Sequence, residues 1–377
     1  MKKVLIISHA YCASENRRKI ELLAEKGDLK TGVVFPNCWK TWHGETKTTS
    51  QNDVSRQFPD NYESFPLPVY FGGDGGRYFY VPVNLLQVIR SFNPEIIHLE
   101  EEPWTPAALE TVIINKLFFQ KKLLIFSWEN IDLPLGYWRE WIERLTFNNA
   151  DSAMAGNTEA LKRLKKHGFN KRIEILPQFG VDTRHFKPLT EFDHDEKQPL
   201  TVGYVGRFVP EKGIDRLFEA VSKIAIPVRL LLVSTTANLP AELEEKAKSL
   251  GLWPKIEVVG GVPHRDLPRY LQRMQIFVLP SPTIPPWKEQ FGRLLIEAMA
   301  CGVPVIGSSS GAIPEVIGPA GLIFDENSVE DLKNKIEKLL IDQPFRDQLA
   351  EAGLARVGAE FTFEKIADKT AEIYRSL

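Results

Sequence analysis

The sequence predicts an α/β protein built from two doubly wound, Rossmann-like parallel-sheet domains. Short apolar runs alternate with helical patterns through both halves of the chain, which is the pattern of βα units. A length of 377 residues is ordinary for two domains, and 43% hydrophobic and 25% charged residues are typical of a globular protein. The polar stretch 187–199 separates the two halves and is the expected linker.

Six apolar runs of the first half are expected to form buried parallel strands. They are residues 4–8, 31–35, 95–99, 123–127, 151–156 and 173–177. Residues 36–80 are rich in Trp, Asn, Gly, Pro and Phe and lack periodicity, which predicts a long loop with a binding role. The glycine-rich run 72–76 inside it predicts an ordinary loop rather than a phosphate loop, because no clear helical pattern follows.

The second half contains a matching set of strands. The runs are residues 201–206, 228–234, 256–260, 276–280, 303–307 and 321–324. The closing segment, residues 361–377, has apolar residues at helical spacing. Two sets of six strands therefore indicate two sheets, followed by a terminal helix.

Two basic residues follow the first strand of the second half. Arg207 comes directly after the strand, and Lys212 precedes Gly213 and a helix that starts near Ile214. A guanidinium fork, an ammonium group and the positive end of a helix together suit the oxygens of a phosphate. The arrangement predicts a diphosphate cradle, and the alternative is a pair of solvated surface charges.

Two carboxylates, Glu289 and Glu297, frame seven residues that include the Phe291-Gly292 turn. Glu297 sits in an otherwise apolar helical segment, where an unpaired carboxylate would be costly to bury. Carboxylates accept hydrogen bonds from hydroxyls, so the pair predicts a polyhydroxylated ligand such as a sugar or a ribose.

Three segments carry a family resemblance. The sequence GRFVPEKG at 206–213, the pair Glu289 and Glu297, and EAMACGVPVIGSSSGAIPEVI at 297–317 closely resemble the family 4 retaining glycosyltransferases, also called glycosyl transferases group 1. The resemblance is specific from about residue 200 to residue 340, and before residue 177 only the strand pattern agrees. It implies the GT-B fold, with a central cleft between an acceptor-side domain (1–187) and a nucleotide-sugar domain (188–358), and a helix (359–377) that crosses back.

The resemblance also implies roles for individual residues. Arg207 and Lys212 hold the donor diphosphate and offset its growing charge, which makes them catalytic. Glu297 accepts hydrogen bonds from the ribose hydroxyls. Glu289 contacts the donor sugar or its phosphate surroundings and is also a candidate catalytic residue, with a place in a surface loop as the alternative.

Backbone groups complete the implied donor site. Phe291 and Gly292 offer N–H groups to sugar hydroxyls, and Gly261 and Val262 lie near the base. Arg293 either adds charge near the phosphates or pairs with Glu289 or Glu297. No cofactor is implied, because the nucleoside-diphosphate sugar is a substrate.

The first domain departs from the family pattern at two loops. Ser14, Glu15 and Asn16 stand where the family has a tight glycine turn, and the following pair, Arg17 and Arg18, faces either an anionic acceptor or solvent.

After the strand at 123–127, family members often place a histidine near the donor sugar, whereas this chain has Trp128, Glu129 and Asn130. Glu129 is therefore the candidate catalytic group of this domain, with a structural carboxylate or cap as the alternative. His98, just before the run 100–102 of three glutamates, is expected to be a satisfied strand-end histidine.

Several classes of site and partner are not expected. The Asp193-His194-Asp195 sequence imitates a metal motif but lies in the linker with no strand before it, so no metal is expected. A net charge of −2 gives no reason to expect nucleic acid. Three cysteines without metal spacing indicate reduced thiols.

The expected location is the cytoplasm. The sequence has no run of about eighteen apolar residues that would span a membrane. The segment 135–145 carries Trp138 and Trp141 at helical spacing beside Arg139 and Arg144. Such a stripe is more often part of a core, and the alternative is peripheral contact with the inner face of a membrane or a lipid-linked acceptor.

The expected function is metal-independent transfer of a hexosyl unit, with retention, from a nucleoside-diphosphate sugar to a sugar, lipid-linked or small-molecule hydroxyl acceptor. The setting would be polysaccharide, glycolipid or glycoconjugate synthesis. Two alternatives stay open, a nucleotide-sugar epimerase of the same fold and a non-catalytic sugar-nucleotide-binding protein.

Overall fold

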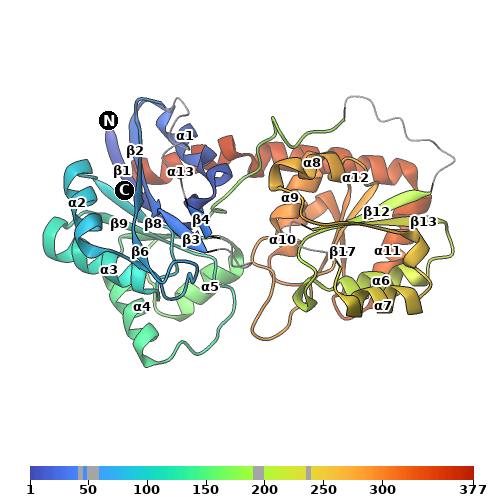
Figure 1. The fold of residues 1–377 in the computed structure, drawn as a ribbon. Helices are drawn as coiled ribbons and strands as arrows, with labels where there is room; N and C mark the ends of the chain where they lie inside the picture. Colours follow the sequence, from blue (N-terminus) through green and yellow to red (C-terminus); the bar gives the residue numbers. More distant parts are fainter. Residues whose placement is uncertain (41–45, 49–58, 190–198, 235–238) are drawn as a thin grey trace. The chain divides into compact units, whose positions relative to one another are not determined.

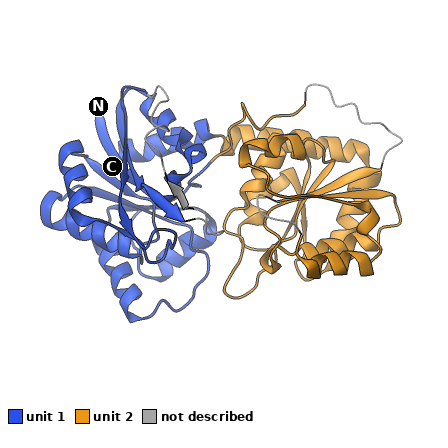
Figure 2. Cartoon of the chain, viewed as in Figure 1, with its two compact units in different colours: residues 1–179, 363–377 blue, residues 180–362 orange. Residues whose placement is uncertain are grey.

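The computed structural model describes residues 1–40, 46–48, 59–189, 199–234 and 239–377. The chain divides into two compact units, shown in Figure 2. The first unit joins Met1–Phe179 to Phe363–Leu377, and the second is Gly180–Thr362. The boundaries expected from the sequence, after residues 187 and 358, lie a few residues from these.

Among the described residues, the first unit contains a seven-stranded sheet in the order β11-β10-β9-β8-β1-β2-β5, in which all neighbours are parallel. The strands are β1 (Lys2–Ile7), β2 (Leu29–Pro36), β5 (Tyr62–Leu67), β8 (Ile96–Leu99), β9 (Lys122–Ser127), β10 (Ser152–Ala155) and β11 (Ile173–Ile175). The strand order reverses between β1 and β8, which makes the carboxyl ends of these two strands the switch point of the sheet.

Helices cover this sheet, as Figure 1 shows. They are α1 (Arg18–Ala24), α2 (Pro82–Phe92), α3 (Pro106–Ile114), α4 (Tyr137–Asn149), α5 (Thr158–Lys166) and α13 (Phe363–Ser376). The C-terminal helix α13 packs beside α1 and buries Ile366 and Tyr374 in the core of the first unit. Lys2 Nζ donates to the Tyr374 carbonyl at 2.9 Å, so the two ends of the chain are joined in this unit.

The expectation of one long loop over residues 36–80 is wrong in part. The fifth strand, β5, pairs with β2, and two short hairpins flank it: β3 (Cys38–Lys40) with β4 (Thr46–Thr48), and β6 (Val69–Tyr70) with β7 (Phe79–Tyr80). Strand β5 includes Pro66, which cannot donate to a ladder. The proline is tolerated because β5 lies at the edge of the sheet.

The second unit has a six-stranded parallel sheet among its described residues, in the order β14-β13-β12-β15-β16-β17. The strands are β12 (Leu200–Val205), β13 (Val228–Val233), β14 (Ile256–Val259), β15 (Ile276–Leu279), β16 (Val305–Ser308) and β17 (Gly321–Phe324). Its switch point lies between β12 and β15.

The helices of the second unit pack on both faces of its sheet (Figure 1). They are α6 (Ile214–Ser222), α7 (Ala241–Ser249), α8 (Leu267–Leu271), α9 (Arg293–Ala300), α10 (Ile313–Ile317), α11 (Val329–Ile341) and α12 (Gln343–Arg356). Of the expected strands in this unit, the run at 303–307 is shifted, because β16 begins only at Val305.

Candidate active site

Three loops at the carboxyl edge of the second sheet meet at Glu289. From the loop after β12, Lys212 Nζ lies 2.7 Å from Glu289 Oε2. From the loop after β15, Ser281 Oγ donates to the same oxygen at 3.3 Å. From the loop after β16, the Ala312 amide donates to the Glu289 carbonyl at 3.0 Å. Glu289 is thus fixed at the switch point of the sheet, where ligands bind in open α/β folds.

Two glycines allow these loops to approach one another. Gly213 has φ +67°, and a Cβ built on it would lie 2.2 Å from the Pro280 carbonyl oxygen. Gly311 has φ +52°, and its Cβ would lie 2.0 Å from the Glu289 carbonyl oxygen. A side chain at either position would force the loops apart, and both backbone conformations favour glycine.

The Lys212 ammonium has an aromatic neighbour that the sequence did not predict. It lies 4.5 Å from the centroid of the Trp287 ring, in cation–π contact. The Lys212 and Glu289 side chains are only 17% and 13% exposed. Their charges are therefore partly removed from water, which strengthens the attraction between them and toward any ionic ligand.

Arg207 is held more loosely. Its Nη2 lies 3.5 Å from Glu211 Oε1, and the side chain is 37% exposed. The Arg207 carbonyl accepts a hydrogen bond from Tyr204 Oη at 2.7 Å. Burial raises the pKa of Tyr204 well above its usual value, so this hydroxyl stays a donor. The structure thus fixes the backbone at Arg207 while the guanidinium stays accessible.

Glu297 is 1% exposed, and it faces a histidine and an arginine. His264 Nε2 lies 2.8 Å from Glu297 Oε1 and donates to it. Arg293 Nε lies at 2.8 Å from the same oxygen, as an ion pair without hydrogen-bond geometry. Of the pairings left open for Arg293, the structure contains the one with Glu297. The other oxygen, Oε2, is buried with no hydrogen-bond partner among the described residues, as an acceptor awaiting a ligand hydroxyl would be.

The turn after β14 brings His264 to this carboxylate. Gly261, with φ +70°, is exposed, whereas Val262 is buried and donates its amide to the Ser234 carbonyl at 3.0 Å. The Val262 amide is therefore already used within the protein. The sequence analysis predicted both residues and missed His264, which lies two positions after Val262. A role of Gly261 and Val262 near the base stays a prediction.

Phe291 and Gly292 lead into α9. Phe291 is buried with its ring centroid 6.0 Å from that of Phe361, and Gly292 has φ +78°. No side chain caps α9 at Gly292. Their contribution to sugar binding stays a prediction.

Three consecutive glutamates follow β8 in the first unit, and each has its own partners. Glu100 accepts from Lys19 Nζ at 2.5 Å and from Gln178 Nε2 at 2.9 Å. Burial alone would raise the pKa of Glu100, but Lys19 and His98 lower it below its usual value. His98 is buried with Nδ1 2.7 Å from Tyr374 Oη, and burial lowers its pKa to about 4. His98 is therefore neutral and buried, but its Nε2 has no hydrogen-bond partner among the described residues, so the expected satisfied histidine is satisfied at Nδ1 alone.

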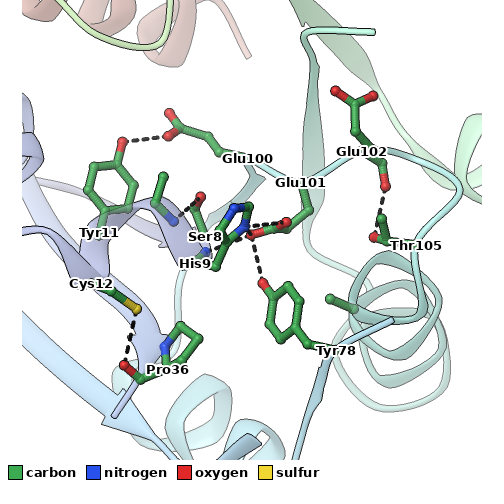
Figure 3. A network of polar contacts seen from close by, with 12 residues as sticks. Ser8, His9, Tyr11, Cys12, Pro36, Tyr78, Glu100, Glu101, Glu102 and Thr105 are labelled. Atoms are coloured by element: carbon green, nitrogen blue, oxygen red, sulfur yellow. Dashed lines mark hydrogen bonds and ion pairs between the residues drawn. The ribbon is translucent and has the colours of Figure 1, made fainter. Parts of the chain in front are cut away.

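The next two glutamates bind loop groups. Glu101 holds His9 and Tyr78, as Figure 3 shows. Glu102 accepts from Ser127 Oγ at 2.6 Å and from the Trp128 amide at 2.7 Å. Burial, with a smaller contribution from the nearby Glu129 charge, raises the pKa of Glu102 to about 7.

Glu129, the candidate catalytic group of this unit, folds back on its own loop. Its amide donates to Glu102 Oε1 at 3.1 Å, and its Oε1 accepts from the Ile131 amide at 3.2 Å. This geometry is that of the structural cap, and a catalytic role for Glu129 stays a prediction.

Arg17 and Arg18 both have partners within the first unit, but Arg17 Nη2 and Arg18 Nε have no hydrogen-bond partner among the described residues. Arg17 is buried, donates from Nε to the Tyr11 carbonyl at 2.8 Å, and lies 4.2 Å from the Phe35 ring centroid. Arg18 Nη1 lies 3.0 Å from Glu25 Oε1. Both guanidinium groups therefore bind within the unit, and contact with an anionic acceptor stays a prediction.

The apolar stripe on α4 is core only in part, because Ile142 is buried and Leu145 packs against the core while the two tryptophans are exposed. Tyr137, Trp138 and Trp141 are 95%, 61% and 48% exposed, and the two indole rings stack with centroids 5.3 Å apart. The buried face of α4 carries Ile142 and Phe147 instead. In the described part of the chain, no helix is long and apolar enough to cross a membrane.

The described residues contain no group of three or more His, Cys, Asp or Glu side chains that could hold a metal ion. The Asp193-His194-Asp195 sequence lies outside the described residues.

The sequence matches known families and proteins over part of its length. The family model described as "Glycosyl transferases group 1" matches residues 187–356. A Corynebacterium glutamicum protein, the GDP-mannose-dependent monoacylated alpha-(1-6)-phosphatidylinositol monomannoside mannosyltransferase, is 31% identical over 230 residues. That match covers 57% of this chain and 60% of the relative, so the chain spans less than two thirds of that protein.

Solved structures match both units. Sucrose-phosphate synthase from Thermosynechococcus elongatus superimposes with a TM-score of 0.72 at 20% identity, covering 100% of this chain and 99% of that one. The Anabaena protein HepE in complex with UDP gives a TM-score of 0.74 at 17% identity and covers 100% of both chains. At this identity the likeness concerns the fold, which is GT-B. Residues 187–356 of the chain are therefore similar to the glycosyl transferases group 1 family, and the chain has the GT-B fold.

Proposed function

We propose that the chain is a retaining glycosyltransferase, which moves a hexosyl unit from a nucleoside-diphosphate sugar to a hydroxyl acceptor without a metal ion. The observation that carries the proposal is the Lys212–Glu289 contact at the switch point of the second sheet. It lies inside the segment that matches the family, and the printed name of the Corynebacterium relative is that of a mannosyltransferase. Glycolipid, polysaccharide or other glycoconjugate synthesis is the proposed setting.

Lys212 and Arg207 would bind the donor diphosphate. Helix α6 starts directly after Gly213 with no side-chain cap, so its first amides are available to an anion beside Lys212. The bond between the anomeric carbon and the diphosphate oxygen breaks, and its electron pair stays on that oxygen. Fixed cations would stabilise that charge, an effect on the order of 10²–10³-fold per group.

The two carboxylates would bind the ribose and the sugar of the donor. Glu297 Oε2 would accept from a ribose hydroxyl, with Oε1 kept in place by His264 and Arg293. Glu289 would face the sugar. In a front-face route the acceptor oxygen forms its bond to the anomeric carbon, and its proton passes to the departing phosphate.

Turnover tests this proposal. Purified protein is incubated with GDP-mannose, UDP-glucose or ADP-glucose, with and without sugar acceptors, in the presence of EDTA, and glycoside formation and nucleoside-diphosphate release are measured. Acceptor-dependent glycoside formation with retained configuration is expected. Isomerised donor without acceptor would instead identify an epimerase, and saturable binding without any turnover would identify a binding protein.

We also propose that the exposed face of α4 contacts an anionic membrane surface. Tyr137, Trp138 and Trp141 suit the interfacial region of a bilayer. Helix α5 packs beside α4 through the buried Arg163–Glu143 ion pair and exposes three lysines, Lys162, Lys165 and Lys166. Basic side chains near an anionic surface add about 1 kcal/mol each.

Flotation with phosphatidylglycerol vesicles tests this contact. Substitution of all three aromatic residues of α4 by Ala should remove vesicle binding. The pair Trp253→Ala and Ile341→Ala, at exposed apolar positions of the second unit, should leave it unchanged. Equal binding by the triple variant and the parent protein would contradict the proposal.

A further inference from the structure

The switch point of the first sheet carries a histidine that the proposed donor chemistry does not use. Strand β1 ends at Ile7 and is followed by His9, and β8 ends at Leu99 and is followed by Glu101. The His9 amide donates to Glu101 Oε1 at 2.6 Å, and His9 Nδ1 lies 2.7 and 2.8 Å from the two carboxylate oxygens (Figure 3). Backbone and ring of His9 are therefore both fixed by one carboxylate from the neighbouring loop.

This contact determines which nitrogen is free. A carboxylate accepts hydrogen bonds, so Nδ1 carries a hydrogen. Burial opposes a charge on His9, but Glu101 raises its pKa above the usual value, so Nε2 presents a lone pair on the neutral ring and an N–H on the protonated ring. Tyr78 Oη donates to Glu101 Oε1 at 2.6 Å and reinforces the carboxylate (Figure 3). No described residue hydrogen-bonds to His9 Nε2, and the side chain is 36% exposed.

Two aromatic side chains and a glycine-rich turn surround the imidazole of His9. Trp39 stacks on the imidazole with ring centroids 4.9 Å apart, and Tyr78 meets it edge-on at 5.7 Å. A Cβ built on Gly75 would lie 3.7 Å from Nε2, so this glycine leaves space next to the free nitrogen. The glycine-rich run that the sequence presented as a plain loop thus borders His9.

A purely structural histidine in this protein looks different. His167 also has a carboxylate at Nδ1, with Glu143 Oε2 at 2.6 Å, but its Nε2 is taken by Asp132 Oδ1 at 2.8 Å. His9 has the same fixed Nδ1 and an open Nε2. His98 also lacks a partner at Nε2 among the described residues, but it is fully buried, whereas the His9 side chain is 36% exposed and can meet a ligand.

We propose that His9, positioned by Glu101, is a binding site for a hydroxyl-rich ring such as a sugar or a cyclitol, with Nε2 hydrogen-bonded to one hydroxyl and Trp39 flanking the ring. As the acceptor subsite, this site rests on the proposed function. The claim that the site binds a ring polyol does not depend on the proposed function. His9 is the binding residue, and Glu101 and Tyr78 are positioning residues.

Histidine ¹H–¹⁵N spectra of the full chain test the binding directly. The sequence has seven histidines, and His9→Phe identifies the His9 signals by their loss. Methyl α-mannopyranoside and myo-inositol are titrated separately, with glycerol as an acyclic control. A saturable shift of His9 Nε2 with a ring polyol is expected, while His167 stays unchanged. Absence of any saturable His9 shift with both ring polyols would overturn the inference.

Positioning has its own signature. Glu101→Gln should change the ¹⁵N shift of His9 Nε2 toward that of mixed tautomers and weaken binding of the ring polyol, and Tyr78→Phe should do so less. If Glu101→Gln binds the polyol like the parent protein with an unchanged Nε2 shift, Glu101 does not position His9. If Glu101→Gln disturbs folding, Tyr78→Phe provides the same test, because it removes only the hydroxyl that donates to Glu101.

Kinetics connect the site to transfer. His9→Phe should raise the KM for the acceptor about tenfold, the effect of one lost hydrogen bond, with nucleoside-diphosphate affinity unchanged. His167→Phe is the matched control and should leave the acceptor KM unchanged. An unaltered acceptor KM in His9→Phe would overturn the acceptor role. Absence of donor binding in the parent protein would overturn the proposed function. The histidine spectra would still show whether His9 binds a ring polyol.

Discussion

Lys212 and Glu289 lie 77 positions apart in the sequence, yet Nζ and Oε2 are 2.7 Å apart at the switch point of the second sheet. Each charge offsets the other where both would meet the donor. A bound diphosphate would therefore share Lys212 with Glu289, and binding and catalysis would be coupled through this contact.

Removal of the Glu289 charge should separate these two effects. Glu289→Gln keeps the shape but no longer neutralises Lys212, so affinity for free nucleoside diphosphate should be equal or higher. The kcat should fall, because the proposed contact with the transferred sugar is weakened. Steady-state kinetics with titration of the free nucleotide measures both, and a loss of nucleotide affinity would contradict the assigned role.

Glu297 should act on donor binding. Glu297→Gln removes the charge that faces His264 and Arg293 and weakens acceptance of a ribose hydroxyl at Oε2, so the donor KM should rise. His264→Ala should change the KM in the same direction by a smaller factor, since Arg293 still holds Oε1. The same kinetic series checks this, and a wild-type KM in Glu297→Gln would show that Oε2 does not meet the donor.

Close packing of the loops makes Gly213 sensitive to substitution. Gly213→Ala should destabilise the protein by several kcal/mol, because its Cβ would meet the Pro280 carbonyl oxygen at 2.2 Å. Gly251 has a similar φ of +68° with nothing within 4 Å of its Cβ, so Gly251→Ala should cost only about 1 kcal/mol. Chemical denaturation measures both, and equal losses of stability would mean that the loops do not approach as described.

The buried His98 should make the protein less stable in acid. Its folded pKa is about 4, below its ordinary value of 6.5, so the unfolded chain binds the proton more readily. Stability from this group is complete above pH 6.5 and is lost as the pH falls toward 4, on the order of 1–3 kcal/mol.

Glu102 has the opposite effect on the pH dependence of stability. Burial raises its folded pKa to about 7, so its contribution is lost as the pH rises through 7. The loss of stability between pH 7 and pH 5 in the parent protein should therefore be compared with that in His98→Gln, where Glu102 is unchanged. A smaller loss in the variant is expected, and identical losses would exclude His98 as the cause.

Much of the fold was predictable because parallel strands buried on both faces are continuous apolar runs. The edge strand β5 was missed because Ser64 and Pro66 interrupt its pattern, which an edge position tolerates. The exposed face of α4 could not be told from a buried one, since spacing shows that a stripe exists and not what covers it.

The candidate site was predictable where its residues are close in sequence, as with Arg207 and Lys212 or Glu289 and Glu297. His264 and His9 were missed because their carboxylate partners lie 33 and 92 positions away. A single histidine after a strand carries no signal until folding brings a carboxylate to one of its nitrogens.

Calorimetric titration of GDP and UDP tests the central claim most directly, that Lys212 beside Glu289 binds the donor diphosphate. Lys212→Met should weaken binding of the preferred nucleotide about 10- to 150-fold, the loss of one charge-assisted contact. Lys333→Met is the matched control, because Lys333 also pairs with glutamates, on α11 of the same unit. The nucleotide affinity of Lys333→Met should equal that of the parent protein. Unchanged affinity in Lys212→Met would contradict the account.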